Sequence, residues 1–127
     1  MQFSKQEIEI IYASGYRFYQ QGAYEKAAEL FTTLVMYDPF DQRSWKGLAA
    51  ARQMDQKYQA AVQAWGVLAL LSGHAPDAHF HAAECLLSWG EREEALRALQ
   101  HAEQTLNSNT DLSAKLQTLK EVLSHAS

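Results

Sequence analysis

Gly22-Ala23-Tyr24-Glu25-Lys26-Ala27 is the first of three related stretches that follow one another at intervals of 34 residues. The second is Gln56-Lys57-Tyr58-Gln59-Ala60-Ala61 and the third is Gly90-Glu91-Arg92-Glu93-Glu94-Ala95. Four residues after each final alanine stands a large apolar side chain, namely Phe31, Trp65 and Leu99. Self-similarity at a fixed period of this size is characteristic of repeat proteins.

A period of 34 residues is that of the tetratricopeptide repeat, whose unit is a pair of antiparallel helices. We therefore predict an all-α fold with three repeats, or six antiparallel helices, and a C-terminal capping helix, wound as a right-handed superhelical solenoid with a concave face. The predicted bounds within one domain of residues 1–127 are about 8–41, 42–75 and 76–109 for the repeats and 110–125 for the capping helix. Small residues would let paired helices approach closely: Gly15, Ala49, Ala83, Ala27, Ala61 and Ala95.

Capping residues and helix breakers predict the individual helices. Ser4 and Glu7 match a capping box, while Gly22, Pro39, Gly73 and Gly90 stop helices. The predicted ranges are about 5–21, 24–37, 41–55, 58–71, 76–89, 92–106 and 111–124, with a polar loop at Asn107-Ser108-Asn109-Thr110. The last helix carries one apolar stripe, which would cover the exposed end of the third repeat: Leu112, Leu116, Leu119 and Leu123. The first helices deviate from the pattern at Arg52 and His79, which occupy core positions.

Composition narrows the functional class. The formal net charge of −4 and a pI near 5.7 argue against nucleic-acid binding, which favours a basic surface. No apolar run approaches the roughly 18 residues that span a bilayer, and the N-terminus lacks the apolar segment of a signal peptide. The single cysteine, Cys85, fits a reducing compartment, where a lone thiol is usually a small core residue. We expect a cytoplasmic protein without a membrane partner.

The inner wall of this repeat consists of the first helices, whose second, fifth, ninth and twelfth positions face the groove. Glu9 and Asp77 hold two second positions, and the predicted peptide-binding residues hold the others: Tyr12, Tyr16, Tyr19, Arg43, Lys46, Ala50, Gln53, Phe80, Glu84 and Leu87. Tyrosine offers apolar area, a hydrogen-bonding tip and little rotamer entropy to lose. Core packing or a subunit contact is the alternative interpretation of the tyrosine stripe. Because Tyr12 and Tyr16 stand where a carboxylate clamp would begin, the expected ligand is an internal, extended segment.

Catalysis and metal binding have little support. The only cluster that suggests either comprises His74, His79, His81, Glu84 and Cys85. His81 and Cys85 have a spacing that can ligate zinc, but no second ligand pair follows, and a packed His79 is the simpler interpretation. Phosphate-binding glycine loops and nucleophile elbows are absent from the sequence. We expect neither an enzyme nor a cofactor.

Three segments and one linker support a narrower assignment: Ile11-Tyr12-Ala13-Ser14-Gly15-Tyr16-Arg17-Phe18-Tyr19-Gln20-Gln21-Gly22-Ala23-Tyr24, Gly47-Leu48-Ala49-Ala50-Ala51-Arg52-Gln53, Phe80-His81-Ala82-Ala83-Glu84-Cys85-Leu86-Leu87 and Tyr37-Asp38-Pro39-Phe40-Asp41. Over nearly the whole chain the sequence resembles the class II chaperones of bacterial type III secretion systems. The resemblance implies a non-enzymatic chaperone in the cytoplasm of a Gram-negative bacterium, which keeps pore-forming translocators soluble and secretion-competent. It also implies that a translocator segment, often of Pro-x-Leu-x-x-Pro type, lies over Tyr12, Tyr16 and Tyr19.

Other partners stay open at this stage. Relatives typically carry a helical arm before the first repeat that serves in dimer contacts, whereas this sequence begins almost at the repeat, so a homodimer is left open. One alternative is a chaperone of another secretion substrate, such as a needle subunit or an effector. The other is an adaptor or regulator that binds a transcription factor in the same groove.

Overall fold

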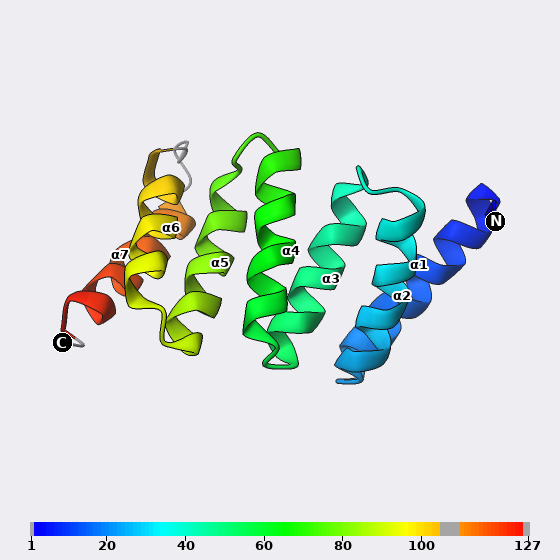
Figure 1. The fold of residues 1–127 in the computed structure, drawn as a ribbon, viewed down its shortest axis with the longest axis horizontal. Helices are drawn as coiled ribbons and strands as arrows, with labels where there is room; N and C mark the ends of the chain where they lie inside the picture. Colours follow the sequence, from blue (N-terminus) through cyan, green and yellow to red (C-terminus); the bar gives the residue numbers. More distant parts are fainter. Residues whose placement is uncertain (1, 105–109, 126–127) are drawn as a thin grey trace. The chain divides into compact units, whose positions relative to one another are not determined.

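The computed structural model describes residues 2–104 and 110–125 (Figure 1). Within these residues the chain forms seven helices and no strand: α1 (Lys5–Gln20), α2 (Tyr24–Tyr37), α3 (Gln42–Met54), α4 (Tyr58–Leu71), α5 (Pro76–Trp89), α6 (Arg92–Gln104) and α7 (Thr110–His125). The all-α prediction is confirmed, and the helix bounds agree with the expected ones to within one or two residues where both can be compared. The predicted helix end at Leu106 and loop residues 107–109 lie outside the described residues.

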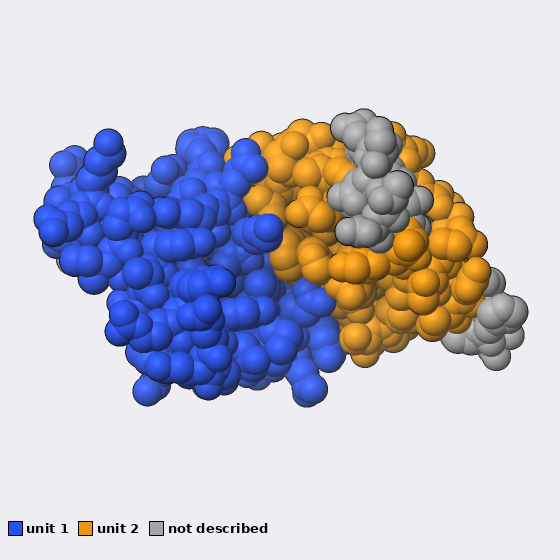
Figure 2. All heavy atoms as spheres, turned by 180° about the vertical axis from the view of Figure 1, so that it is seen from behind, with its two compact units in different colours: residues 1–64 blue, residues 65–127 orange. Residues whose placement is uncertain are grey.

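The chain divides into two compact units, Met1–Ala64 and Trp65–Ser127, which Figure 2 shows in different colours. The boundary falls within α4. In unit 1, helix α2 contacts both α1 and α3; in unit 2, helix α6 contacts both α5 and α7.

Side chains at the helix starts satisfy the backbone N–H groups that have no partner within the helix. The capping box is present as predicted, since Ser4 Oγ accepts from the Glu7 N–H at 3.0 Å and Glu7 Oε1 accepts from the Ser4 N–H at 2.9 Å. Asp41 caps α3 by accepting from the Arg43 N–H at 3.2 Å. Helix α5 begins with Pro76, whose fixed φ suits a first turn.

The residue that opens each repeated stretch ends the first helix of its repeat. Gly22, Gln56 and Gly90 adopt left-handed φ angles of 80°, 61° and 93°. The next N–H then reaches back to a helix carbonyl: Ala23 to Phe18 at 2.9 Å, Lys57 to Arg52 at 2.9 Å and Glu91 to Leu86 at 2.8 Å. This is the geometry of a Schellman cap, and it explains why the sequence repeats most clearly here.

Phe31 is the centre of the unit 1 core, with 1% of its surface exposed. Its ring lies against two glycines, because a Cβ at Gly15 would come within 3.1 Å of the ring and one at Gly47 within 2.6 Å. Helices α1 and α3 therefore both approach α2 at a residue that has no side chain. Ala27, Leu34 and other apolar residues complete this core.

The core of unit 2 is made from the small and apolar faces of its helices. Ala83, Ala95 and Leu99 are buried at the positions that the repeat predicts. In α7, Leu116 and Leu123 are buried and Leu119 is half-buried, so the described part of the predicted stripe faces the protein. The side chain of Leu112 lies outside the described residues.

Candidate peptide-binding site

A hollow of about 360 Å³ in unit 1 unites most of the predicted groove residues. We call it the tyrosine pocket; it is lined by Tyr12, Tyr16, Tyr19, Phe31, Arg43, Lys46, Gly47 and Ala50. Every predicted site residue of unit 1 except Gln53 lines it. Its walls are α1 and α3, the first helices of the first two repeats.

The depth of this pocket has a structural cause. Gly47 and Ala50 leave space along α3, and the ring of Phe31 from α2 lines the hollow between them. Tyr12 packs edge-on against Phe31, with ring centroids 5.7 Å apart. Sequence reasoning assigned Phe31 only to the core and missed Gly47 as a lining residue. The signal for Gly47 was its place beside Lys46, a predicted groove position.

The tyrosines form a partly open aromatic wall. Tyr16 is 51% exposed, so in this chain it is a surface residue and not a core residue. Tyr12 and Tyr19 are half-buried, and Tyr19 packs against Tyr24 with ring centroids 5.4 Å apart. Burial, together with the neighbouring Tyr24 and Tyr16 hydroxyls, raises the pKa of Tyr19 above its usual range. The Tyr19 hydroxyl is therefore neutral at physiological pH and can donate a hydrogen bond.

An ion pair fixes one edge of the pocket. Arg43 donates from Nη1 to Glu9 Oε2 at 3.1 Å and from Nη2 to Glu9 Oε1 at 2.8 Å, while its guanidinium lies 3.9 Å from the centroid of the Tyr12 ring. The hydrogen bond lowers the pKa of the Glu9 carboxyl and raises the pKa of Arg43. Arg43 is thus held within the chain. Lys46 takes part in no ion pair among the described residues, so its ammonium is the better candidate to contact a ligand.

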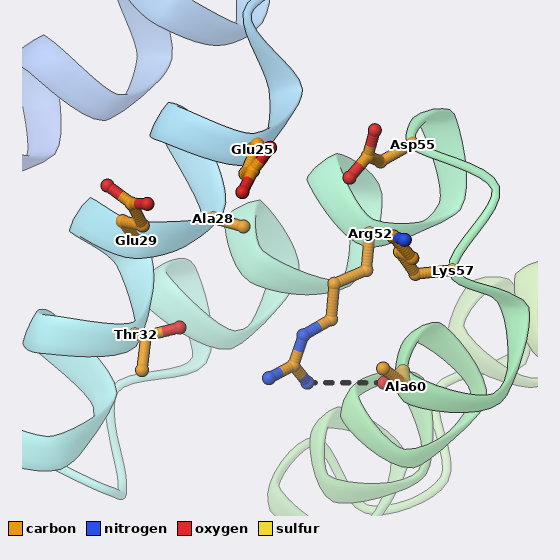
Figure 3. A pocket seen from close by; sticks show the side chains of 8 residues that line it. All are labelled: Glu25, Ala28, Glu29, Thr32, Arg52, Asp55, Lys57 and Ala60. Atoms are coloured by element: carbon orange, nitrogen blue, oxygen red, sulfur yellow. Dashed lines mark hydrogen bonds between the residues drawn. The ribbon is translucent and has the colours of Figure 1, made fainter.

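Arg52 lies in a different hollow, of about 490 Å³, between α2 and the α3–α4 turn (Figure 3). Its guanidinium reaches across this hollow and donates from Nη1 to the carbonyl of Ala60 at 3.2 Å. Burial lowers the pKa of Arg52. A polar residue is tolerated at this core position because the side chain is only half-buried and its charged end points into the hollow. Gln53 lines neither this hollow nor the tyrosine pocket.

The three predicted site residues of unit 2 have different environments. Phe80 is 7% exposed, and with Glu84 it lines a hollow of about 390 Å³ whose other wall is α7. Glu84 Oε1 lies 2.7 Å from His81 Nδ1, and the His81 ring stacks on Trp65 at 4.6 Å between centroids. Leu87 is half-buried and does not line this hollow.

The remaining histidines and the cysteine belong to the interior and edge of unit 2. His74, His79 and His101 stack with ring centroids 5.0 to 6.4 Å apart, and His74 Nδ1 lies 3.1 Å from His79 Nε2. Cys85 is buried, and burial with the nearby Glu84 charge raises the pKa of its thiol to about 12. Among the described residues, no group of three His, Cys, Asp or Glu side chains is arranged to hold a metal ion.

Similar proteins place this geometry in a known family. Tetratricopeptide repeat sequences match residues 8–41 and 44–72. Low calcium response locus protein H of Yersinia pestis is 33% identical to this chain over 125 residues, which are 96% of this chain and 74% of that protein. The crystal structure of the Yersinia enterocolitica type III secretion chaperone SycD, in complex with a peptide of the translocator YopD, is 32% identical with a TM-score of 0.87, covering 95% of each chain. The chain belongs to the type III secretion translocator chaperones.

A further structure supports this membership. The translocator chaperone PcrH of Pseudomonas aeruginosa, in complex with the chaperone-binding region of PopD, has a TM-score of 0.87 and 31% identity over 97% of this chain and 95% of that chain. As for the membrane, no helix in residues 2–104 and 110–125 has both the length and the apolar character needed to cross one.

Proposed function

We propose that this chain is a cytoplasmic, non-enzymatic chaperone that binds an extended segment of a secreted translocator in the tyrosine pocket and keeps that protein soluble and secretion-competent. The observation that carries the proposal is the convergence of Tyr12, Tyr16, Tyr19, Lys46 and Ala50 on one hollow. The partners named for SycD and PcrH are translocators, which favours this class over a needle subunit, an effector or a transcription factor.

The pocket suits an extended segment with spaced apolar side chains. The exposed ring of Tyr16 offers apolar area, and the gap above Gly47 and Ala50 accepts a side chain of moderate size. An extended backbone brings N–H and carbonyl groups that need partners. The tyrosine hydroxyls and the Lys46 ammonium can supply them. Gln53, Phe80, Glu84 and Leu87 are proposed to contact the segment beyond this pocket.

The test is calorimetric titration with a Pro-x-Leu-x-x-Pro peptide from a translocator of the same organism. We expect the parent chain to bind it and Tyr16→Glu to bind it at least tenfold more weakly, about 1.4 kcal/mol, because a charge would be buried under the ligand. Met54→Glu is the matched control, since Met54 is 50% exposed and does not line the pocket. It should bind like the parent.

Thermal unfolding decides how a loss of binding is interpreted. The midpoint of Tyr16→Glu should match that of Met54→Glu within a few degrees. A much lower midpoint for Tyr16→Glu would make the tyrosine stripe a core element and contradict the proposed pocket. Failure of the parent chain to bind the peptide would direct the search to another secretion substrate.

A further inference from the structure

Helix α7 does more in unit 2 than cover apolar side chains. Together with α5 it encloses the hollow of about 390 Å³ lined by Phe80, His81, Glu84, Lys115, Thr118, Leu119 and Val122, which we call the α7 pocket. Phe80 and Glu84 follow Tyr12 and Tyr16 by two repeat periods, so they occupy the same positions of the repeat. The α7 pocket thus has the same first wall as the tyrosine pocket.

The second wall is also built alike. In the tyrosine pocket α3 contributes four residues on one helical face, Arg43, Lys46, Gly47 and Ala50. In the α7 pocket α7 contributes four residues with the same spacing, Lys115, Thr118, Leu119 and Val122. Helix α7 begins at Thr110, one period after α5 begins at Pro76. It therefore occupies the place of the first helix of a further repeat, the element that supplies the opposite wall of the tyrosine pocket.

The lining of the α7 pocket defines what it can hold. Phe80, Leu119 and Val122 supply the apolar surface, and Val122 remains 49% exposed. Glu84 and Lys115 bring a carboxylate and an ammonium to the same lining. Opposite charges of this kind complement the N–H and carbonyl dipoles of an extended chain, while the apolar surface suits a side chain that leaves water.

We propose that the α7 pocket holds an apolar side chain of the same extended translocator segment, at a point of that segment outside the part bound in the tyrosine pocket. This inference rests on the proposed function. It makes α7 a ligand-binding helix, and it makes Phe80 and Val122 determinants of affinity for long segments.

The experiment compares two probes on the full chain. One is the Pro-x-Leu-x-x-Pro hexapeptide, and the other is a segment of about 25 residues centred on it, which spans up to roughly 80 Å when extended. Val122→Glu should bind the long segment at least tenfold more weakly than the parent and the hexapeptide equally well. Val122→Trp, which fills the hollow without a charge, should give the same pattern. Leu96→Glu is the control, because Leu96 is 39% exposed on α6 and does not line the pocket.

The outcomes separate this inference from the function on which it rests. If both Val122 variants bind the long segment like the parent while Tyr16→Glu does not, the α7 pocket is not a ligand site and the proposed function stands. If the parent binds neither probe, the proposed function fails, and the inference fails with it. If Val122→Glu instead converts a dimer to a monomer in light scattering and leaves binding unchanged, the occupant is a second copy of the chain and the proposal is overturned.

Discussion

At the scale of single residues, one backbone position distinguishes the second repeat from the other two. Gly22 and Gly90 end their helices in the left-handed region, where glycine has no steric penalty. Gln56 adopts the same conformation at φ 61° with a side chain attached, which costs an L-residue about 1–2 kcal/mol. The middle repeat therefore carries local strain that the outer repeats avoid.

Substitutions at these three equivalent positions should change stability in opposite directions. We expect Gln56→Gly to raise the free energy of unfolding by about 0.5–1 kcal/mol, with the greater freedom of glycine in the unfolded chain offsetting part of the gain. Gly22→Ala and Gly90→Ala should each lower it by about 1 kcal/mol. A Cβ at either glycine would meet nothing within 4 Å, so any loss comes from the backbone. Urea unfolding followed by circular dichroism measures all three; a destabilised Gln56→Gly would contradict the strain argument.

At the scale of helices, the approach of α3 to α2 depends on a missing side chain. A Cβ at Gly47 would lie 2.6 to 2.8 Å from the ring of Phe31, closer than two carbon atoms can pack. Phe31 cannot move away easily, because Gly15 of α1 holds the other side of the same ring. One glycine in α3 thus sets both the helix spacing and the depth of the tyrosine pocket.

Two helical glycines provide a matched test of this packing. Gly47→Ala should destabilise the protein by about 1–3 kcal/mol through overpacking, and it should weaken peptide binding because the pocket floor shifts. Gly66→Ala in α4 should instead stabilise it by roughly 0.5–1 kcal/mol, since a Cβ there meets nothing within 4 Å and alanine favours the helix. Differential scanning calorimetry of both variants measures the effect. Equal effects of the two substitutions would show that Phe31 does not limit the approach of α3.

At the scale of the whole molecule, the stacked histidines make stability depend on pH. Burial first, and then the neighbouring His101 and His74, lower the pKa of His79 below its ordinary value of 6.5. The unfolded chain therefore binds a proton at this residue more readily than the folded chain does. The stability that neutral His79 contributes is fully present above pH 6.5 and is lost as the pH falls through that value towards the folded pKa.

We expect the melting midpoint to fall between pH 7.5 and 5.5, and to fall less in His79→Leu, which places an aliphatic side chain where repeat 1 has Ile11. Carboxylates with lowered pKa values, such as those of Glu7 and Glu9, titrate below this window and do not contribute to the slope. Thermal unfolding of both proteins in matched buffers checks the prediction. The same slope in both would assign the pH dependence to other groups.

The period of 34 residues by itself determined the all-α class, the bounds of the helices and the face of α1 that carries the tyrosines. These features depend on local rules, because caps, breakers and helical spacing act within a few residues of chain. The same rules brought Tyr12, Lys46 and Ala50 correctly to one pocket, since equivalent positions of successive repeats face the same way.

Only the tertiary structure decided what those side chains do once helices pack. It paired Arg43 with Glu9, buried most of Phe80, pointed Arg52 into its own hollow and made α7 a wall of a second pocket. None of these outcomes follows from a repeat register, because each depends on the distance between side chains of different helices. That distance is set by the volumes that meet in the core, such as Phe31 against Gly15 and Gly47.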